Sequence, residues 1–401
     1  MTAINFTALG RQIIFDPDIV SPPNIDERLF PKPSSLALDV SGSCNLKCAY
    51  CAENSTMPKR EPMQTKTLNQ SIDSIFNWSE KKSGVSIHLG SGEPLLNPKL
   101  IQALCERARA QAKEHHKPLS LYLTTNGTLL NDQIAKWLMA GNWNVKISID
   151  GDQATHDRYR ISKTGQGTYH TIKTAVNQLA KQIPERFSTT SVLCHGTDPK
   201  DVFHAIASMG VKRIEMVPIA AAQASKFTLR QNDFDAYRRF IIEYAQRIAK
   251  GEENVPVNIR FHNRLMKTLG YRNSRVPCGA GRTFFAAGPQ GDIYPCFRFV
   301  GISKYRLGDL SGINTERVKW FTASSGRPYE QRTQCQRCWA APLCGGPCYA
   351  CADLFGSGSA LPSYCEIVRI ESEAALWLSS YLRENNIERL IELMGLKVQE
   401  E

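Results

Sequence analysis

Three cysteines near the N-terminus have the residue type and the spacing to do chemistry. Cys44, Cys48 and Cys51 are separated by three and then two residues, and the next cysteine is Cys105. A [4Fe–4S] cluster that is closed by protein takes four thiolates, so three thiolates leave one iron without a protein ligand. An iron with a free position can bind a small molecule, by the logic that separates a catalytic zinc site from a structural one. The spacing therefore indicates a ligand-binding cluster. A structural zinc site or scattered buried thiols are the alternatives.

A second ordered set of cysteines lies in the last third of the chain. Cys278 is followed by Gly291 and then, after four intervening residues, by Cys296. A CxxC pair, Cys335 and Cys338, comes next. Cys344, Cys348 and Cys351 follow it at short intervals, and Cys365 is the last cysteine. The chain has 13 cysteines and its N-terminus does not look like a signal peptide, which favours metal over disulfides. A pair of zinc knuckles is the alternative to clusters in this region.

Alternating strand and helix patterns predict the elements that position the first set. The predicted strands are 35–40, 85–89, 119–123, 144–149, 188–193 and 214–218, and helices between them include 97–113, 131–140, 168–181 and 199–209. Strands that alternate with helices form βα units around a parallel sheet. The expected fold class is therefore α/β, with a partial (β/α)6 barrel over about residues 35–260. In such barrels the active site lies at the C-terminal ends of the strands.

Small and polar residues follow several of these predicted strands. The segment 91–94 (SGEP) follows the second strand, and small residues there let the backbone approach a ligand closely. Asn126 follows the third strand. Ser148 and Asp150 alternate along the fourth strand and therefore face the same side. Arg160 comes shortly afterwards, and a guanidinium can bind a carboxylate through two parallel hydrogen bonds.

The CxxxCxxC loop after a first strand resembles that of the radical S-adenosylmethionine (SAM) superfamily, and Tyr50 matches an aromatic residue common in that motif. In that family the open iron chelates the amino and carboxylate groups of SAM, and reduction cleaves SAM to a 5'-deoxyadenosyl radical. The segment 91–94 resembles the family's GGEP motif, and 156–160 (HDRYR) resembles its HDxxR motif. The resemblance implies SAM contacts from Gly90, Gly92, Glu93, Asn126, Ser148, Asp150, Arg160 and Leu193. Arg160 would pair with the SAM carboxylate, and Glu93 would accept hydrogen bonds from its ammonium group.

The second cysteine set resembles the SPASM extension of radical SAM proteins, which binds two auxiliary [4Fe–4S] clusters. By position, the ligands of an outer cluster would be Cys335, Cys338, Cys344 and Cys365. The ligands of an inner cluster would include Cys278, Cys296 and Cys348. The fourth ligand of the inner cluster is not assigned. Its fourth iron either keeps a free position or is bound by Cys351 or by a non-cysteine group. The cofactors implied are three [4Fe–4S] clusters and SAM.

The 401 residues divide into four predicted parts: an N-terminal extension over 1–34, the radical SAM partial barrel over 35–270, a small SPASM domain over 271–370 and a C-terminal helical segment over 371–401. The sequence has neither a signal-peptide pattern nor an apolar run long enough to span a membrane, so a cytoplasmic protein without a membrane partner is expected. The formal net charge of +11 suits an acidic peptide or a nucleic acid. Because no basic run with interleaved aromatic residues is present, a nucleic-acid partner is not expected.

SPASM proteins act mainly on peptides or proteins, and two activities compete here. Sulfatase-maturing enzymes oxidise a Cys or Ser to formylglycine and resemble one another in an Asp directly after the GxxxxC cysteine. Here Phe297 follows Cys296 instead. The segment 293–301 (IYPCFRFVG) looks more like enzymes that form thioether or carbon–carbon crosslinks in ribosomally made precursor peptides, and that function is favoured. The sequence does not assign a catalytic base.

The favoured function implies several partners. The substrate would be a precursor peptide or protein. The extension over 1–34 is too short for a peptide-recognition domain, so a separate recognition protein is expected. A reductant such as flavodoxin or ferredoxin would supply electrons. An iron–sulfur electron carrier or scaffold protein is the non-catalytic alternative, and it would need the clusters but not the SAM-binding segments.

Overall fold

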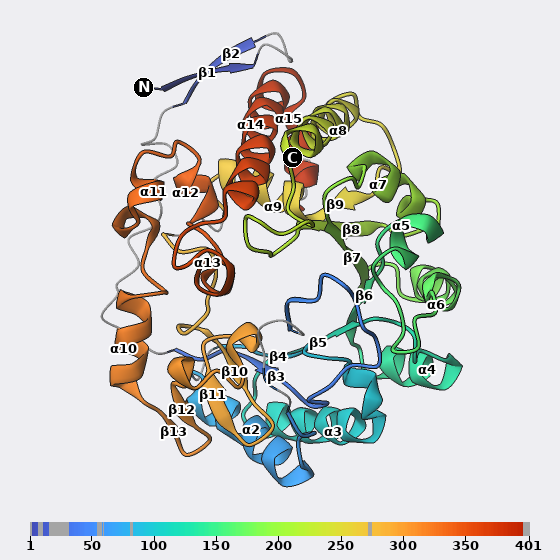
Figure 1. Cartoon of the computed structure of the whole chain (residues 1–401), viewed down its shortest axis with the longest axis vertical. Coiled ribbons are helices and arrows are strands. Elements are labelled where there is room, and N and C mark those ends of the chain that lie inside the picture. The colour runs from blue at the N-terminus through green and yellow to red at the C-terminus, as the bar shows by residue number, and fades with distance from the viewer. Residues whose placement is uncertain are drawn as a thin grey trace, which may run out of the picture.

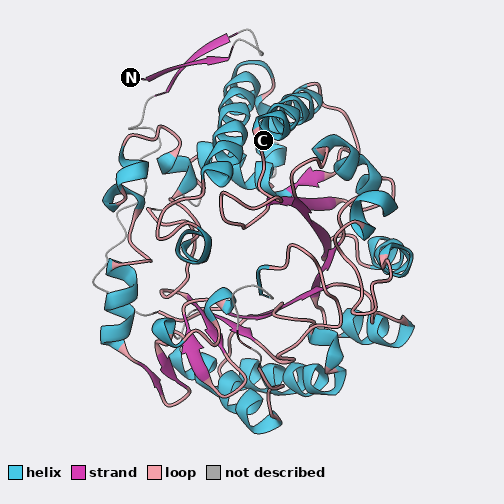
Figure 2. Ribbon diagram, in the orientation of Figure 1, coloured by secondary structure: helices cyan, strands magenta, loops and turns pink. Residues whose placement is uncertain are grey.

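Six parallel strands form the centre of the sheet (Figures 1 and 2). The computed structural model describes residues 2–6, 11–15, 32–53, 58, 60–80, 83–271 and 275–395. The six strands are β3 (Ser35–Leu38), β4 (Val85–Leu89), β5 (Leu119–Thr125), β6 (Asn144–Ser148), β7 (Phe187–Leu193) and β8 (Arg213–Pro218). Each strand pairs in parallel with the next one along the chain. The predicted strand positions and the parallel α/β fold are confirmed.

Helices connect these strands and surround the sheet (Figure 1). They are α2 (Thr65–Trp78), α3 (Pro98–Glu114), α4 (Asp132–Ala140), α5 (Gln153–Asp157), α6 (Tyr169–Gln182), α7 (Pro199–Ala207) and α8 (Gln231–Ala249). Helix α4 begins after Asn131, whose side-chain oxygen accepts a hydrogen bond from the Ile134 N–H at 2.9 Å. Such a cap satisfies a backbone donor that has no partner within the helix. The four predicted helices agree with α3, α4, α6 and α7 to within two residues.

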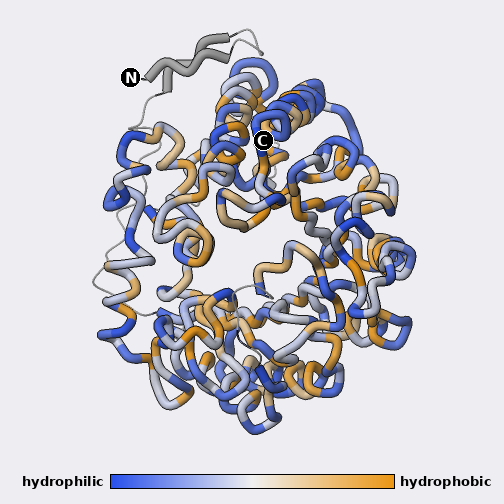
Figure 3. The backbone as a smooth tube through the Cα atoms, viewed as in Figure 1, coloured by the Kyte–Doolittle hydropathy of each residue, from blue (hydrophilic) through white to orange (hydrophobic). Residues whose placement is uncertain are grey.

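Burial alternates along the strands and separates a helix-covered face from an inner face. In β6, Val145 and Ile147 are buried in the apolar core. Lys146 and Ser148 lie on the opposite face of the same strand and are partly exposed. Lys146 pairs there with Glu215 of β8 at 2.7 Å. Hydrophilic residues are otherwise concentrated on the outer turns of the peripheral helices (Figure 3).

Short strands of the cysteine-rich region continue the same sheet, which the sequence analysis did not predict. β10 (Phe284–Ala287) pairs in parallel with β3. β11 (Asp292–Tyr294), β12 (Gly308–Asp309) and β13 (Gly312–Ile313) then follow in antiparallel order. With β9 (Val257–Asn258) at the other edge, the sheet has 11 strands. The sheet therefore runs across the predicted domain boundary at residue 270.

The remaining helices lie mostly in the C-terminal third. The α-helices are α9 (Ile259–Thr268), α10 (Thr315–Ala323), α11 (Thr333–Gln336), α12 (Ala341–Cys344), α13 (Tyr349–Phe355), α14 (Pro362–Asn385) and α15 (Ile387–Leu393). Short 3₁₀ helices occur at Pro94–Leu96, Phe297–Phe299, Ser303–Tyr305 and Tyr329–Gln331. Helix α14 packs against α8 and α9. A buried ion pair between Arg260 and Glu371, at 2.8 Å, joins α9 to α14.

The N-terminal extension contains two strands that its proline-rich sequence did not predict. β1 (Thr2–Phe6) and β2 (Arg11–Phe15) pair in antiparallel register. The proline-containing part of the extension lies almost entirely outside the described residues. Across the described residues, no helix combines the length and the apolar character that crossing a membrane requires.

Candidate functional site

The first cysteine loop begins directly after β3 and folds back on itself. Cys44, Cys48 and Cys51 are all partly buried, and the Cys51 N–H donates to the Cys48 carbonyl at 3.1 Å. Burial raises the pKa of Cys48 to about 11, Arg160 opposes this shift, and Cys51 and Cys44 add to it. The three thiols therefore lie close enough for their charges to interact, as a shared cluster requires.

The SGEP segment lies directly against this loop. Gly92 has a φ of +59°, and a Cβ at this position would lie 2.2 Å from the carbonyl oxygen of Ser43. The Glu93 N–H donates to the same carbonyl at 2.8 Å. Only glycine allows this approach without displacing the backbone of the cysteine loop. Gly90 lies beside Thr124 of β5, where an added Cβ would be 3.3 Å from the Thr124 Cβ.

The Glu93 carboxylate ties this segment to the end of β5. It is fully buried and accepts hydrogen bonds from the Leu95 N–H at 2.9 Å, the Thr125 hydroxyl at 2.7 Å and the Asn126 N–H at 2.7 Å. Burial raises the pKa of Glu93, and the bond from Asn126 opposes that shift. Glu93 therefore holds together the ends of two strands, and its predicted contact with the SAM ammonium stays a prediction.

Asn126 is brought directly to the cysteine loop. Its side-chain amide lies 3.7 Å from the Cys44 sulfur, to which it donates a hydrogen bond, and 2.8 Å from the Asn45 side-chain oxygen. The Leu46 N–H also donates to the Cys44 sulfur, at 3.4 Å. Hydrogen bonds to cluster sulfurs help to set the reduction potential of an iron–sulfur cluster. Asn126 therefore has a defined contact with a predicted cluster ligand.

A buried network links the cysteine loop to the ends of β6 and β7. The Tyr50 hydroxyl donates to one oxygen of Asp150, and the other oxygen accepts the Val192 N–H at 3.0 Å. Arg160 donates to the Tyr50 hydroxyl at 2.8 Å. The network thus joins Tyr50, Asp150 and Arg160, which are separated by up to 110 positions in the sequence.

The Arg160 guanidinium has an unused donor in this network. Its side chain is only 7% exposed, and its Nε has no hydrogen-bond partner among the described residues. A buried N–H without a partner is costly, and a bound ligand or an ordered water can supply the missing acceptor. A carboxylate from a bound molecule is the acceptor that a guanidinium fits best. This donor fits the predicted pairing of Arg160 with the carboxylate of SAM.

The other members of the HDRYR segment hold the local structure. His156 is fully buried, accepts the Asp150 N–H at 3.2 Å and contacts the Thr168 hydroxyl at 3.0 Å. Burial, reinforced by the charge of Arg160, lowers the pKa of His156 to about 3. Asp157 accepts the Thr168 N–H at 2.7 Å, at the beginning of α6. The segment therefore fixes the turn from which Arg160 extends.

Ser148 and Leu193, the last two predicted SAM contacts, lie on different faces of the sheet. Ser148 lies at the end of β6 on the inner face of the sheet. Leu193 is 2% exposed and belongs to the apolar core, whereas its neighbour Val192 lies on the inner face. Both SAM contacts stay predictions.

Sequence reasoning missed a second layer of residues beneath the cysteine loop. Asp39 and Arg60 form a buried ion pair there. Glu53 accepts the Gly92 N–H at 2.9 Å and lies 3.6 Å from Arg60. Asp39 is a charged residue at the end of an apolar strand, which was the one available signal. Neither the spacing of Arg60 nor that of Glu53 indicates a partner.

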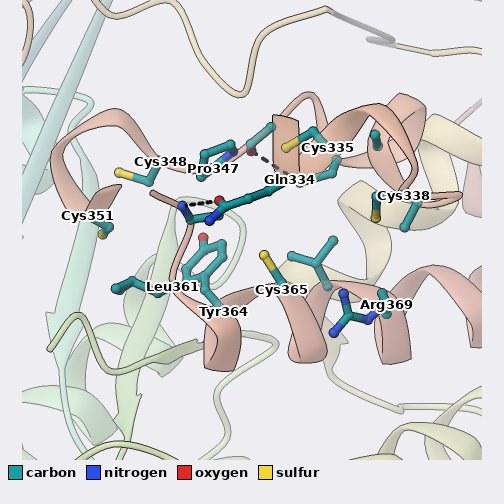
Figure 4. Close-up of a pocket in the computed structure, with 16 residues that line it drawn as sticks. Gln334, Cys335, Cys338, Pro347, Cys348, Cys351, Leu361, Tyr364, Cys365 and Arg369 are labelled. Carbon is teal, nitrogen blue, oxygen red and sulfur yellow. Dashed lines mark hydrogen bonds between the residues drawn. The ribbon is translucent and has the colours of Figure 1, made fainter. Parts of the chain in front are cut away.

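The four thiols predicted for the outer cluster are brought together by α11, α12, α14 and the segments beside them. Three of them, Cys335, Cys338 and Cys365, are labelled along one cavity in Figure 4. Burial raises the pKa of Cys365 to about 12, and the charges of Cys344, Cys335 and Cys338 add to that shift.

The three thiols predicted for the inner cluster are also neighbours. Burial raises the pKa of Cys296, and the charges of Cys348 and Cys278 raise it further. Cys351 lies in the same group: a hydrogen bond from the Cys351 thiol lowers the pKa of Cys348. Cys105 and Cys194, which belong to neither predicted cysteine set, have no cysteine among the groups that shift their pKa.

The predicted ligands of all three clusters are thiols, which are the donors that iron–sulfur clusters take. Over the described part of the chain, no three His, Cys, Asp or Glu side chains are arranged to hold one metal ion. The thiolates of a [4Fe–4S] cluster bind separate irons, so they surround a larger volume than the ligands of one ion. The chemistry and grouping of the thiols therefore fit the predicted clusters.

Comparisons with known proteins also indicate a radical SAM domain. Residues 38–209 match the model of the radical SAM superfamily. A cysteine-type anaerobic sulfatase-maturating enzyme of Clostridium perfringens is 26% identical over 347 residues, which cover 80% of this chain and 90% of that protein. The mycofactocin maturase MftC of Mycolicibacterium smegmatis is 25% identical over 332 residues, covering 81% of this chain and 80% of MftC. The structure of native anSMEcpe with bound AdoMet and Cp18Cys peptide aligns with a TM-score of 0.74 at 22% identity and covers 89% of this chain and all of that one. At that identity the structural match shows the fold alone.

Proposed function

Because residues 38–209 match the radical SAM superfamily, we propose that this chain is a radical SAM enzyme that crosslinks a ribosomally made precursor peptide. The new bond is a thioether or a carbon–carbon bond. Its relatives at about a quarter identity include enzymes named for the maturation of sulfatases and of mycofactocin. Modification of a peptide or protein is therefore the general activity from which the crosslinking function is proposed.

The chain's own residues supply the parts that this chemistry needs. Cys44, Cys48 and Cys51 would hold the first cluster, and the unpartnered Nε of Arg160 would bind the carboxylate of SAM. The Asn126 amide, 3.7 Å from the Cys44 sulfur, would orient that ligand. When bound, the reduced cluster and SAM supply the 5'-deoxyadenosyl radical that abstracts a hydrogen atom from an unactivated carbon. The protein's part is to orient both molecules and to exclude water.

One observation favours crosslinking over formylglycine formation. Sulfatase-maturing enzymes resemble one another in an Asp directly after the GxxxxC cysteine, where it serves as a base. Here Phe297 occupies that place, and the next side chain, Arg298, lies 3.5 Å from the Cys351 sulfur. The nearby Asp292 is paired with Arg306 at 2.6 Å. A cation therefore lies at the inner thiols, close to the position of that base.

The alternative function is the maturation of a sulfatase, in which a Cys or Ser becomes formylglycine. Two comparisons support this alternative function: the match to the relative of Clostridium perfringens and the fold shared with anSMEcpe. This alternative would require a base other than the residue after Cys296.

Further partners follow from the proposed function. The substrate would be a precursor peptide, and the net charge of +11 suits an acidic one. We also propose a separate peptide-recognition protein and a reductant such as flavodoxin or ferredoxin, with all three clusters bound in a reducing cytoplasm.

The experiment that tests this proposal is mass spectrometry of a peptide substrate. The enzyme is co-expressed anaerobically with each small reading frame that adjoins its gene, and in parallel with a Cys-containing sulfatase peptide. Loss of a pair of hydrogen atoms from a precursor, absent with Cys48→Ala, is the expected result. Conversion of Cys to an aldehyde in the sulfatase peptide, with no change in any precursor, would instead establish the alternative.

A further inference from the structure

Cys351 occupies a position that the seven-cysteine pattern leaves unexplained. It lies on α13, and Cys348 is the residue that caps the beginning of that helix. Both residues line the same cavity. Figure 4 shows Cys348 and Cys351 together at one end of the cavity, while Cys335, Cys338 and Cys365 lie towards the other. Cys351 therefore belongs spatially with the inner group.

A partly buried cation connects Cys351 to the segment that follows another inner thiol. Arg298 is two residues beyond Cys296, and its Nη1 donates to the Cys351 sulfur at 3.5 Å. Cys351 itself is only 6% exposed. A cation is favourable beside a group of thiolates, because burying several negative charges together is otherwise costly. The Cys351 thiol is thus joined to the Cys296 segment through one guanidinium.

We propose that Cys351 is the fourth thiolate of the inner cluster, with Cys278, Cys296 and Cys348. This assignment rests on the proposed function, which includes that cluster. It closes the last iron, so the inner cluster has no free position for a thiolate of the substrate. The one open iron of the enzyme is then the iron of the N-terminal cluster. A crosslinked cysteine of the substrate would be held by protein side chains and not by an auxiliary iron.

The assignment is tested in a variant that lacks the N-terminal cluster and therefore its open iron. In the full chain with Cys44, Cys48 and Cys51 all changed to Ala, reconstitution is expected to give about eight irons, four for each auxiliary cluster. Mild oxidation should give no [3Fe–4S] signal in electron paramagnetic resonance, because every remaining iron has a thiolate ligand. Adding Cys351→Ala should then produce that signal on oxidation, or lower the iron content by about four per chain.

Matched variants identify the cause of any change. Cys105→Ala removes a partly buried thiol outside the set and should leave the iron content and the spectrum unchanged. Cys365→Ala opens the outer cluster and is the positive control. The assignment is overturned if the triple variant itself gives the [3Fe–4S] signal and Cys351→Ala does not increase it. A triple variant that binds no iron would instead overturn the proposed auxiliary clusters, and the assignment with them.

Discussion

At the scale of single residues, Arg160 is the residue whose geometry points most directly to the predicted ligand, SAM. Its guanidinium is buried, yet one N–H has no partner among the described residues. Hydrogen bonds to charged groups contribute about 1.5–3 kcal/mol each. Arg160 is therefore the side chain whose loss should weaken SAM binding most clearly.

We expect Arg160→Gln to weaken SAM binding. The Kd for SAM should rise about tenfold to a hundredfold, because one or two charge-assisted hydrogen bonds to its carboxylate are lost. Equilibrium dialysis of labelled SAM against the reconstituted protein measures this change. Arg158→Gln is the matched control, since Arg158 is exposed and contacts the ring of Tyr159. Equal affinities for the two variants would contradict the role of Arg160.

Gly92→Ala should destabilise the protein more than the same change at another glycine of positive φ. At Gly92 the added Cβ would meet the Ser43 carbonyl at 2.2 Å, so the cysteine loop must shift. At Gly165, which has a φ of +82°, nothing lies within 4 Å of the added Cβ. We expect a loss of about 2–3 kcal/mol at Gly92 and about 1 kcal/mol at Gly165. Thermal unfolding under anaerobic conditions compares the two, and similar losses would show that the loop tolerates the contact.

Local spacing in the sequence predicts groups of cysteines, but it predicts little of what surrounds them. The thiols of each set are grouped by local spacing, which is visible in the chain. The contact between Asn126 and Cys44 joins two strand ends, and Tyr50 meets Asp150 100 positions away. Such pairs depend on how the strands are aligned in the sheet, which no local pattern encodes.

At the scale of elements, the turn between β6 and α6 is organised by His156. Its ring accepts the Asp150 N–H and contacts the Thr168 hydroxyl, so it joins the end of the strand to the beginning of the helix. The ring is neutral in the folded protein because burial lowers the pKa of His156 from 6.5 to about 3. The turn that presents Arg160 therefore depends on an uncharged imidazole.

This lowered pKa predicts a pH dependence of stability. Below about pH 6.5 the unfolded chain takes up a proton that the folded chain does not, so the stability contributed by His156 is lost as the pH falls towards about 3. At about pH 5.5 the loss should be about 1 kcal/mol. The melting temperature should fall more steeply below about pH 6.5 for the wild type than for His156→Gln. His170→Gln, at an exposed position, should keep the wild-type slope, and identical slopes in all three proteins would refute the assignment.

The elements that the sequence predicted well are those with strong local periodicity. The six barrel strands and the helices between them alternate in a regular way. The short strands β10 to β13 were not predicted, because two to four residues carry too little pattern. The pairing of β10 with β3 joins segments about 250 positions apart, which local patterns do not encode.

At the scale of the whole molecule, one sheet connects the first cysteine loop to the cysteine-rich region. The loop begins after β3, and β10 is the direct neighbour of β3. The inner thiol Cys296 follows β11, which pairs with β10. This continuity holds the predicted inner cluster and the predicted SAM site on one framework, so a peptide placed between them would be held by a single body.

The formation of 5'-deoxyadenosine tests the central claim most directly, namely that the cluster of Cys44, Cys48 and Cys51 keeps one iron open for SAM. The full chain is reconstituted anaerobically and mixed with SAM and dithionite, and the nucleoside product is quantified by liquid chromatography and mass spectrometry. The wild type and Cys105→Ala should both form 5'-deoxyadenosine, whereas Cys48→Ala should form none. A reconstituted wild type that forms no 5'-deoxyadenosine, or a Cys48→Ala variant that forms as much as the wild type, would contradict the account.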